Sequence, residues 1–419
     1  MKNVSLFLLR LITPVQLIFS VRVLLRFLSR SEKPISPDDM SYAGEERVAI
    51  IVPVLNEVTR LAPCLDGLVT QGAEVAEIIV VDGGSHDGTQ ALVISYSRKD
   101  SRIRLVDASP VPSTWNGKAW GLQVGLQSLQ TCASWVLTID ADVRPQAQLV
   151  KALLGRGKRD QLDALSVATL QEIEGIGESL LHPALLTTLV YRFGIPNKLF
   201  RRVDEVQANG QCFLFRREVL NASNGFTPVK TSICEDVTVA RLLVSKGYRV
   251  SFYEAGSLVR VRMYDNWREL WRNWPRSLMM HDAYSGPNTL LGWLEVLFVQ
   301  ALPLPLLLTL LLTHSRRSLI YYALLHPQRM QARTNKRWRC GRVYNKLALY
   351  SINIFLIAVR IGVLFGTART YERRPWSYWG SPLCDLPVTL WLGKMALQRR
   401  HTWRGRALVR DDDFPNRSL

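Results

Sequence analysis

The sequence lacks the residue patterns that mark a zinc site, a disulfide framework or a phosphate-binding loop. Its six cysteines include no CxxC pair, and its six histidines include no HExxH or i, i+4 pair. Neither GxGxxG nor GxxxxGK[ST] occurs at the expected place, so a dinucleotide or ATP site lacks its usual loop. The cysteines are therefore predicted to be separate, reduced thiols in a cytosol-facing protein, and any metal is expected to have oxygen ligands.

Acidic residues are missing from a long stretch of the C-terminal half. The chain has 419 residues and a formal net charge of +18, and no Asp or Glu lies between Glu295 and Glu372. Eleven Lys and Arg residues interrupt long apolar runs there, which is typical of a membrane-associated region. A nucleic-acid binder would carry its charge on a polar face instead, so nucleic acid is not expected as a partner.

An uncharged run of about 20 residues is also missing near the N-terminus. Residues 4 to 28 are apolar but contain Arg10, Arg22 and Arg26. Residues 1 to 30 are therefore predicted to form either a tilted membrane span or a helix in the membrane interface. A cleaved signal peptide is disfavoured because no small-residue cleavage site follows. The polar segment 31 to 46 reads as a linker.

Residues 281 to 405 are predicted to be a second membrane-associated region. The run 289 to 313 is long enough to span a bilayer, but Pro303 and Pro305 interrupt it, and a second apolar run follows at 347 to 366. Two full crossings fit this pattern, and so does a re-entrant hairpin followed by an interfacial helix.

Residues 47 to 280 alternate strand-like apolar runs with helical patterns. This order predicts an α/β domain with a mainly parallel sheet between helices and right-handed crossovers. Strands are expected at 48 to 54, 77 to 81, 103 to 107 and 135 to 140, and helices at 58 to 70, 87 to 98, 118 to 129 and 236 to 246. The tail from 406 to 419 is expected to be disordered.

Carboxylates stand where two of these strands end. Asp82 follows the run IIVV, and Asp140 and Asp142 follow WVLTI. Open α/β sheets bind ligands at the carboxyl ends of their strands. Asp140 and Asp142 point to the same side as alternate residues and would repel each other without a cation between them. Mg2+ or Mn2+, bound also by diphosphate oxygens, meets that need, although an Asp-rich helix N-terminus is the structural alternative.

Further polar residues lie at the starts of predicted helices. Pro53, Asn56 and Glu57 in VPVLNE are placed at the sheet edge, although a helix-capping Asn gives the same pattern. Lys118 in WNGKAW is suited to offset diphosphate charge, or is simply solvated.

Two acidic residues and an aromatic run complete the candidate site. Glu235 and Asp236 open a predicted helix, where carboxylates also act as caps. The run RMYDNWRELWRNWPR, residues 262 to 276, carries Trp and Arg groups suited to cover a diphosphate or to lie at a membrane interface.

The motifs P-x-L-N-E, D-G-G-S-x-D-G-T, D-A-D and E-D, in this order over residues 47 to 280, resemble family 2 glycosyltransferases with the GT-A fold. The resemblance implies that Asp82 and the first strand hold the nucleoside, that Asp140 and Asp142 bind the metal and the diphosphate, and that Asp236 deprotonates an acceptor hydroxyl. The implied reaction is an inverting single displacement, with the base across the sugar from the leaving diphosphate and the metal stabilising the departing charge.

One departure from the family pattern and one further likeness refine this resemblance. The QxxRW pattern of processive members is replaced by a looser run in which Arg272 and Trp274 are the nearest candidates, which favours transfer of a single sugar. The WNGK segment, SPLCDLPVTLW and TWRGR are similar to membrane-bound glycosyltransferases that act on carotenoids, such as the myxol 2'-O-glycosyltransferase type. The resemblance thus implies a nucleotide-sugar donor, a lipophilic acceptor and a catalytic domain that faces the cytoplasm.

A stripe of apolar residues agrees with a lipophilic acceptor, although an ordinary core helix has the same pattern. Its members are Ile176, Leu180, Leu181, Leu185, Leu186, Leu189 and Phe193. Asn209 and Gly210 in NGQC, together with Glu235, are expected to approach the acceptor. A hopanoid, sterol or sphingolipid acceptor stays open, as does an inactive membrane protein that only binds ligands through this domain. The oligomeric state is not indicated.

Overall fold

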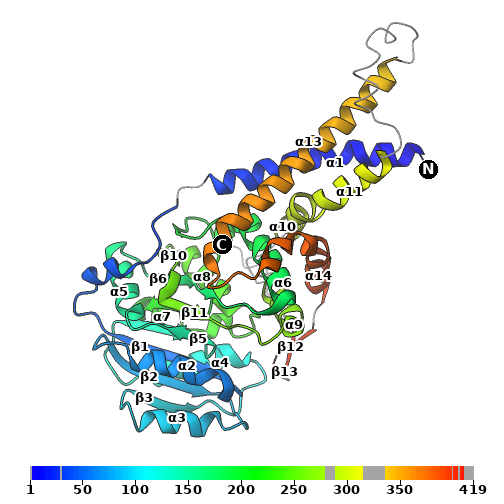
Figure 1. Cartoon of the computed structure of the whole chain (residues 1–419). Helices are drawn as coiled ribbons and strands as arrows, with labels where there is room; N and C mark the ends of the chain where they lie inside the picture. The colour runs from blue at the N-terminus through cyan, green and yellow to red at the C-terminus, as the bar shows by residue number, and fades with distance from the viewer. Residues whose placement is uncertain are drawn as a thin grey trace.

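A mixed sheet of eight strands forms the centre of the molecule (Figure 1). The computed structural model describes residues 2–28, 31–278, 288–314, 336–398, 400–403 and 406–409. The strand order is β3-β2-β1-β4-β9-β6-β10-β8; β9 and β8 run against the other six strands, so the predicted mainly parallel sheet is confirmed. The strands are β1 (Val48–Val54), β2 (Val75–Asp82), β3 (Ile103–Asp107), β4 (Trp135–Ile139), β6 (Ala164–Ala168), β8 (Lys198–Leu199), β9 (Cys212–Arg216) and β10 (Val250–Glu254).

Helices cover both faces of this sheet. Ile50 and Ile51, neighbours on β1, are fully buried in two different apolar clusters, as expected when side chains alternate across a covered sheet. The helices are α2 (Val58–Val69), α3 (Thr89–Ser97), α4 (Gly117–Gln127), α5 (Leu149–Arg159), α6 (Gly175–Phe193), α7 (Arg217–Ala222), α8 (Glu235–Ser245) and α9 (Trp267–Leu278). The strands and helices expected between 48 and 129, the strand expected at 135 to 140 and the helix expected at 236 to 246 are confirmed, with ends that differ by two residues at most.

A smaller sheet is formed by segments that follow the carboxyl ends of main-sheet strands. It consists of β5 (Val143–Pro145), β11 (Val259–Val261) and β7 (Leu170–Gln171), in the order β5-β11-β7. Gln171 also forms a parallel bridge with Tyr371, and its carbonyl accepts the backbone N–H of Glu372 at 3.1 Å. The C-terminal part of the chain is thereby joined to the edge of the α/β domain.

Helices from both chain ends lie together on one side of the α/β domain. In Figure 1, α1, α11 and α13 project away from the sheet, and α13 packs against both α1 and α11. These elements are α1 (Lys2–Phe27), α10 (Asn288–Val296), η5 (Leu297–Ala301), α11 (Pro303–His314), α13 (Lys336–Thr367), η7 (Ala368–Thr370), η8 (Trp376–Cys384) and α14 (Asp385–Leu397). Residues 315 to 335, between α11 and α13, lie outside the described residues.

One described helix segment, Leu347–Thr370, is long and apolar enough to cross a membrane. The segments Thr289–Ala301 and Pro303–Leu312 also qualify if they are taken together, but they meet at an angle of 41°. The bend falls where Pro303 removes a backbone donor, as the sequence predicts. This geometry fits either a broken span or a re-entrant pair.

A buried carboxylate accounts for two arginines that interrupt the apolar N-terminal run. Glu295 on α10 accepts Arg22 Nε at 2.5 Å and Arg26 Nη1 at 2.6 Å, and its side chain is 1% exposed. These ion pairs fasten α1 to α10. The last acidic residue before the acid-free stretch therefore neutralises charges that are more than 260 residues away in the sequence.

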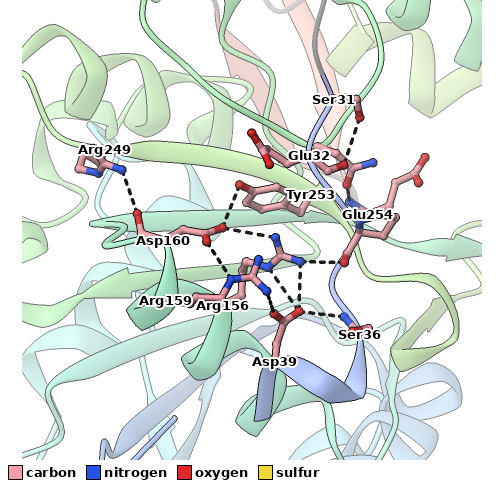
Figure 2. A network of polar contacts seen from close by, with 12 residues as sticks. Ser31, Glu32, Ser36, Asp39, Arg156, Arg159, Asp160, Arg249, Tyr253 and Glu254 are labelled. Carbon is pink, nitrogen blue, oxygen red and sulfur yellow. Dashed lines mark hydrogen bonds and ion pairs between the residues drawn. The ribbon is translucent and has the colours of Figure 1, made fainter. Parts of the chain in front are cut away.

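The segment predicted as a linker is bonded firmly to the α/β domain (Figure 2). Its 3-10 helix η1 (Pro37–Tyr42) packs on α5. Asp39, 1% exposed, pairs with Arg156 Nη2 at 3.1 Å and with Arg159 Nη1 at 2.5 Å. Gly155 permits this contact, since a Cβ there would lie 1.8 Å from the carbonyl oxygen of Asp39. Residues 31 to 46, called the strap below, therefore tie the chain that follows α1 to the α/β domain.

Replacing Asp39 by Ala is expected to lower the free energy of unfolding by about 3 kcal/mol, because the buried guanidinium of Arg156 loses its buried carboxylate partner and keeps only the more exposed Asp160. Denaturant unfolding of the detergent-solubilised protein measures this change. The control is Asp204→Ala at the exposed Arg202–Asp204 pair, where less than about 1 kcal/mol is expected. Equal effects of the two variants would show that the strap is not held by this network.

Two short paired strands are the last part of the chain that the structure describes. β12 (Arg400–Trp403) pairs antiparallel with β13 (Arg406–Val409). Residues 406 to 409 therefore form a strand, whereas disorder was the expectation from sequence. The remaining tail, 410 to 419, lies outside the described residues.

Candidate functional site

A cavity of about 1000 Å3 opens at the carboxyl ends of the parallel strands. The chain leaves β1 at Leu55, β4 at Asp140 and β6 at Thr169, and it enters the antiparallel β9 from Gln211, so all four segments meet at this edge. Ten of the thirteen residues proposed from the sequence line the cavity. They are Pro53, Glu57, Lys118, Asp140, Asp142, Asn209, Gly210, Glu235, Asp236 and Trp274.

Lys118 links two carboxylates in the polar part of the cavity. Its Nζ lies 2.9 Å from Asp140 Oδ1 and 2.8 Å from Glu235 Oε1. Burial lowers the pKa of Lys118, but the charges of Asp140 and Glu235 outweigh this effect and hold the pKa well above its ordinary value. Lys118 is therefore a permanent cation between the end of β4 and the start of α8.

Asp142 lies close to Asp140 at the bend between β4 and β5. Burial, with added repulsion from Asp140, raises the pKa of Asp142 to about 8. Its Oδ1 is a buried atom without a hydrogen-bond partner among the described residues. A buried carboxylate next to another one is stabilised either by a proton or by a cation.

Asp140 and Asp142 are suited to bind a divalent cation whose remaining ligands come from a substrate. Among the described residues, no group of three or more His, Cys, Asp or Glu is placed to hold a metal ion. Mg2+ in phosphate-transfer sites commonly takes one or two carboxylates and completes its shell with phosphate oxygens and waters. Asp140 and Asp142 supply this number of carboxylates.

Asp236 is held by backbone groups at the start of α8. The N–H of Gly210 donates to its Oδ2 at 2.6 Å, and the N–H of Val237 donates to its Oδ1 at 2.8 Å. Burial, followed by the charge of Glu235, raises the pKa of Asp236 to about 7. Gly210 leaves little free space, since a Cβ there would lie 2.9 Å from Lys118 Nζ and 3.2 Å from Asp236 Oδ2. Asp236 is therefore a fixed carboxylate suited to accept a proton near neutral pH.

Three residues proposed from the sequence do not line the cavity. The exposed Asn56 accepts the backbone N–H of His86 at 2.9 Å. The buried Asp82 accepts the N–H groups of Gly84 and Ser85, and the side-chain amide of Gln90 at 2.6 Å. Both residues shape the loop after β2, of which Gly83 reaches the cavity. The third, Arg272, is exposed on α9.

Sequence reasoning missed several residues of the wall. Arg276, one turn after Arg272 on α9, lines the cavity, as does the half-buried Tyr264 before the helix. Trp274 packs against the buried ring of His182 in a tilted arrangement, with centroids 4.1 Å apart. Burial lowers the pKa of His182 to about 3, so its imidazole is neutral. The basic and aromatic run indicated this segment as part of the site, but its sequence does not show which arginine faces the cavity.

The apolar stripe of α6 meets the cavity at two of its predicted positions. Leu186 and Leu189 line it, whereas Leu185 is in the core and Ile176 is 58% exposed. Leu180, Leu181 and Phe193 are not part of the lining. The cavity is thus lined by apolar side chains of α6 as well as by the carboxylates at the strand ends.

Part of the α/β domain matches the model of a known protein family. Residues 49–223 match the family model of Glycosyl transferase family 2. The 4,4'-diaponeurosporenoate glycosyltransferase of Staphylococcus aureus is 25% identical over 242 residues, which cover 56% of this chain and 61% of that protein. The lipopolysaccharide core biosynthesis glycosyltransferase LpsC of Rhizobium meliloti is 39% identical over 90 residues, covering 22% of this chain and 29% of that protein. This chain spans less than two thirds of each of these relatives.

The chain is also similar to a solved structure. The mannosyltransferase PcManGT from Pyrobaculum calidifontis, in complex with GDP-Man and Mn2+, is 18% identical. It aligns with a TM-score of 0.49 and covers 84% of this chain and 99% of that chain.

Proposed function

Because residues 49–223 are a family 2 glycosyltransferase domain, we propose that this protein transfers one sugar from a nucleotide-diphospho-sugar to a hydroxyl of a lipophilic acceptor, with inversion. The proposal rests on one feature of the cavity: the carboxylates at the strand ends and the apolar side of α6 face the same space. A charged donor and an apolar alcohol need such a site, with one polar and one apolar wall.

The donor is proposed to bind at the polar wall. Pro53 in β1 and Glu57 after this strand, with the loop shaped by Asn56 and Asp82, are proposed to hold the nucleoside. Arg276 on α9, in preference to the exposed Arg272, and Trp274 are proposed to cover the diphosphate.

Asp140 and Asp142 are proposed to hold Mg2+ or Mn2+, which would stabilise the negative charge that develops on the leaving diphosphate. Lys118 adds a fixed positive charge beside Asp140, 2.9 Å away. Because the lysine also pairs with Glu235, it keeps the donor half and the acceptor half of the cavity at a fixed separation.

Asp236 is proposed to be the general base. The acceptor oxygen forms a bond to the anomeric carbon, the bond from that carbon to the diphosphate breaks, and the hydroxyl proton passes to Asp236. The backbone N–H groups of Gly210 and Val237 hold the carboxylate in place. Asn209, Gly210 and Glu235 line the part of the cavity around Asp236, where the acceptor hydroxyl is proposed to lie.

A carotenoid is the proposed acceptor. The relative from Staphylococcus aureus, named for 4,4'-diaponeurosporenoate, supports this choice. We further propose that residues 1 to 30 and 281 to 405 associate with a membrane, because Leu347–Thr370 is apolar enough to span it and both parts pack together. The domain from 47 to 280 is proposed to face the cytoplasm, in agreement with free thiols such as Cys64 and Cys212.

The transfer rate is expected to rise with pH up to about 7, because only ionised Asp236 accepts a proton. Below this pH the carboxyl is protonated, so the rate should fall about tenfold per pH unit. Turnover measured from about pH 5 to about pH 9 at saturating substrates tests this expectation. Glu235→Gln removes one cause of the raised pKa and should move the acidic limb to lower pH. A rate that stays level down to about pH 5 in the unaltered protein would contradict the assignment.

The proposed acceptor is tested by comparing pigments and polar lipids from cells with the gene intact and deleted. Chromatography and mass spectrometry should show loss of a glycosylated carotenoid and accumulation of the same carotenoid without its sugar. Unchanged carotenoids together with a missing glycolipid would instead identify a hopanoid, sterol or sphingolipid acceptor. No change in either class, with no transfer by the purified protein, would contradict the proposed function.

A further inference from the structure

The cavity continues beyond the catalytic domain, into the helices of the two chain ends. Leu24 and Phe27 of α1 line it, as do Val359, Gly362, Val363 and Gly366 of α13. These walls carry apolar groups, and they adjoin Leu186 and Leu189 of α6. The cavity therefore has an apolar arm, defined by these eight residues, that is continuous with the polar space around Asp236.

Helix α13 presents three different sides. Leu349, Leu356 and Leu364 are buried against neighbouring elements, with at most 1% of each residue exposed. Ile354, Phe355 and Phe365 are 47 to 63% exposed, as expected for side chains that meet lipid. Val359, Gly362, Val363 and Gly366 form a third side, which lines the cavity, and Thr367 lines the cavity as well.

The glycines of α13 leave this strip open. A Cβ at Gly362 or Gly366 would meet no atom within 4 Å, and both residues are exposed. Glycine is a poor helix former, and a larger residue here would not clash with the protein. The two glycines, four residues apart, therefore keep free space where any side chain would extend into the arm or its mouth.

We propose that the apolar chain of the acceptor enters from the bilayer between α1 and α13 and lies against Gly362 and Gly366, with its hydroxyl toward Asp236. This inference rests on the proposed function, and it assigns the occupant of the apolar arm to a long hydrocarbon or polyene chain. The donor cannot occupy this arm favourably, because the arm offers its charged groups no partner among Leu24, Phe27, Val359 and Val363.

The opposite wall of the passage is held in place. The ion pairs of Glu295 with Arg22 and Arg26 fix α1 immediately beside Leu24 and Phe27. On α13, the side chain of Asn353 accepts the amide of Gln16 at 3.0 Å, which joins the two helices farther along their length. These polar contacts hold α1 against α10 beside Leu24 and Phe27, and they join α1 to α13 at Gln16 and Asn353.

The experiment measures binding of retinol, a polyene alcohol, to the purified full-length protein by quenching of tryptophan fluorescence. Gly366→Leu and Gly362→Leu are expected to weaken retinol binding at least tenfold, because leucine fills the arm. The matched control is Ala358→Leu, which adds similar bulk at an exposed position of α13 outside the lining and should leave binding unchanged. An unchanged midpoint of thermal unfolding shows that each variant is folded.

The outcomes separate this inference from the proposed function. Equal retinol affinity of both glycine variants and the unaltered protein would overturn the passage, even if sugar transfer is observed. Loss of binding in Gly366→Leu and Gly362→Leu supports the passage even if no acceptor is glycosylated, a result that would count against the enzyme proposal alone. Weaker binding in Ala358→Leu as well would overturn the passage, because it would trace the effect to α13 in general.

Discussion

Replacing Asp236 by Asn is expected to reduce the rate of sugar transfer by about 10³-fold while donor binding is kept. Asn has nearly the same size, and its oxygen can still accept the N–H of Gly210, which now lies 2.6 Å from Asp236 Oδ2. The amide cannot take up the proton of the acceptor hydroxyl. Only the chemical step should therefore suffer.

Turnover and donor affinity are measured separately for this variant, the first with labelled donor and the second by titration calorimetry. Glu235→Gln is the matched control, since it alters the neighbouring carboxylate that pairs with Lys118 at 2.8 Å. A loss of about tenfold is expected for the control, because Glu235 positions Lys118 and is not proposed to accept the proton. Loss of donor binding in Asp236→Asn would place Asp236 in the donor site instead.

Removing the divalent cation is expected to lower transfer by at least about 10²-fold, the equivalent of roughly 3 kcal/mol of stabilisation of the leaving diphosphate. The same loss is expected for Asp142→Asn, since this side chain has a buried oxygen that lacks a partner among the described residues. Chelation should be reversed by added Mn2+ or Mg2+ in the unaltered protein. Asp142→Asn should need a much higher concentration of the cation.

Titration of Mn2+ against both proteins measures this difference, with the donor present because diphosphate oxygens are expected to complete the coordination shell. Asp66→Asn serves as the control, as it changes an exposed carboxylate of α2 outside the cavity lining. Full activity in the presence of chelator would contradict a role for any metal. Lys118 would then be the remaining cation positioned to offset the diphosphate charge.

The location of the site could be predicted from the sequence, because parallel strands end at the same edge of a sheet. The chain leaves β1 before Glu57 and β4 at Asp140, and the carboxyl ends of parallel strands share one edge. Their meeting in one cavity needed no knowledge of side-chain packing. Side-chain packing was needed to place Asp82 and Arg272. Asp82 points into the loop after β2, and the rotation of α9 directs Arg276 into the cavity in place of Arg272.

The relation between the chain ends and the site was also beyond the sequence. Composition predicted apolar segments with interrupting arginines, but the pairing of Arg22 and Arg26 with Glu295 depends on the packing of α1 against α10. The strap shows the same limit. Residues 31 to 46 are mostly polar, yet Asp39 is buried. Gly155 makes this possible because it lets the backbone at Asp39 lie close to α5.

The sequence by itself determined the order of the elements, the mainly parallel sheet and the motifs that match family 2, since these depend on local periodicity and on the edge that parallel strands share. Only the tertiary structure decided that Lys118 bridges Asp140 and Glu235, and that the glycines of α13 line the same cavity as Asp236. Such contacts join residues that are distant in the chain, and they depend on helix rotation and on side-chain packing that periodicity does not encode.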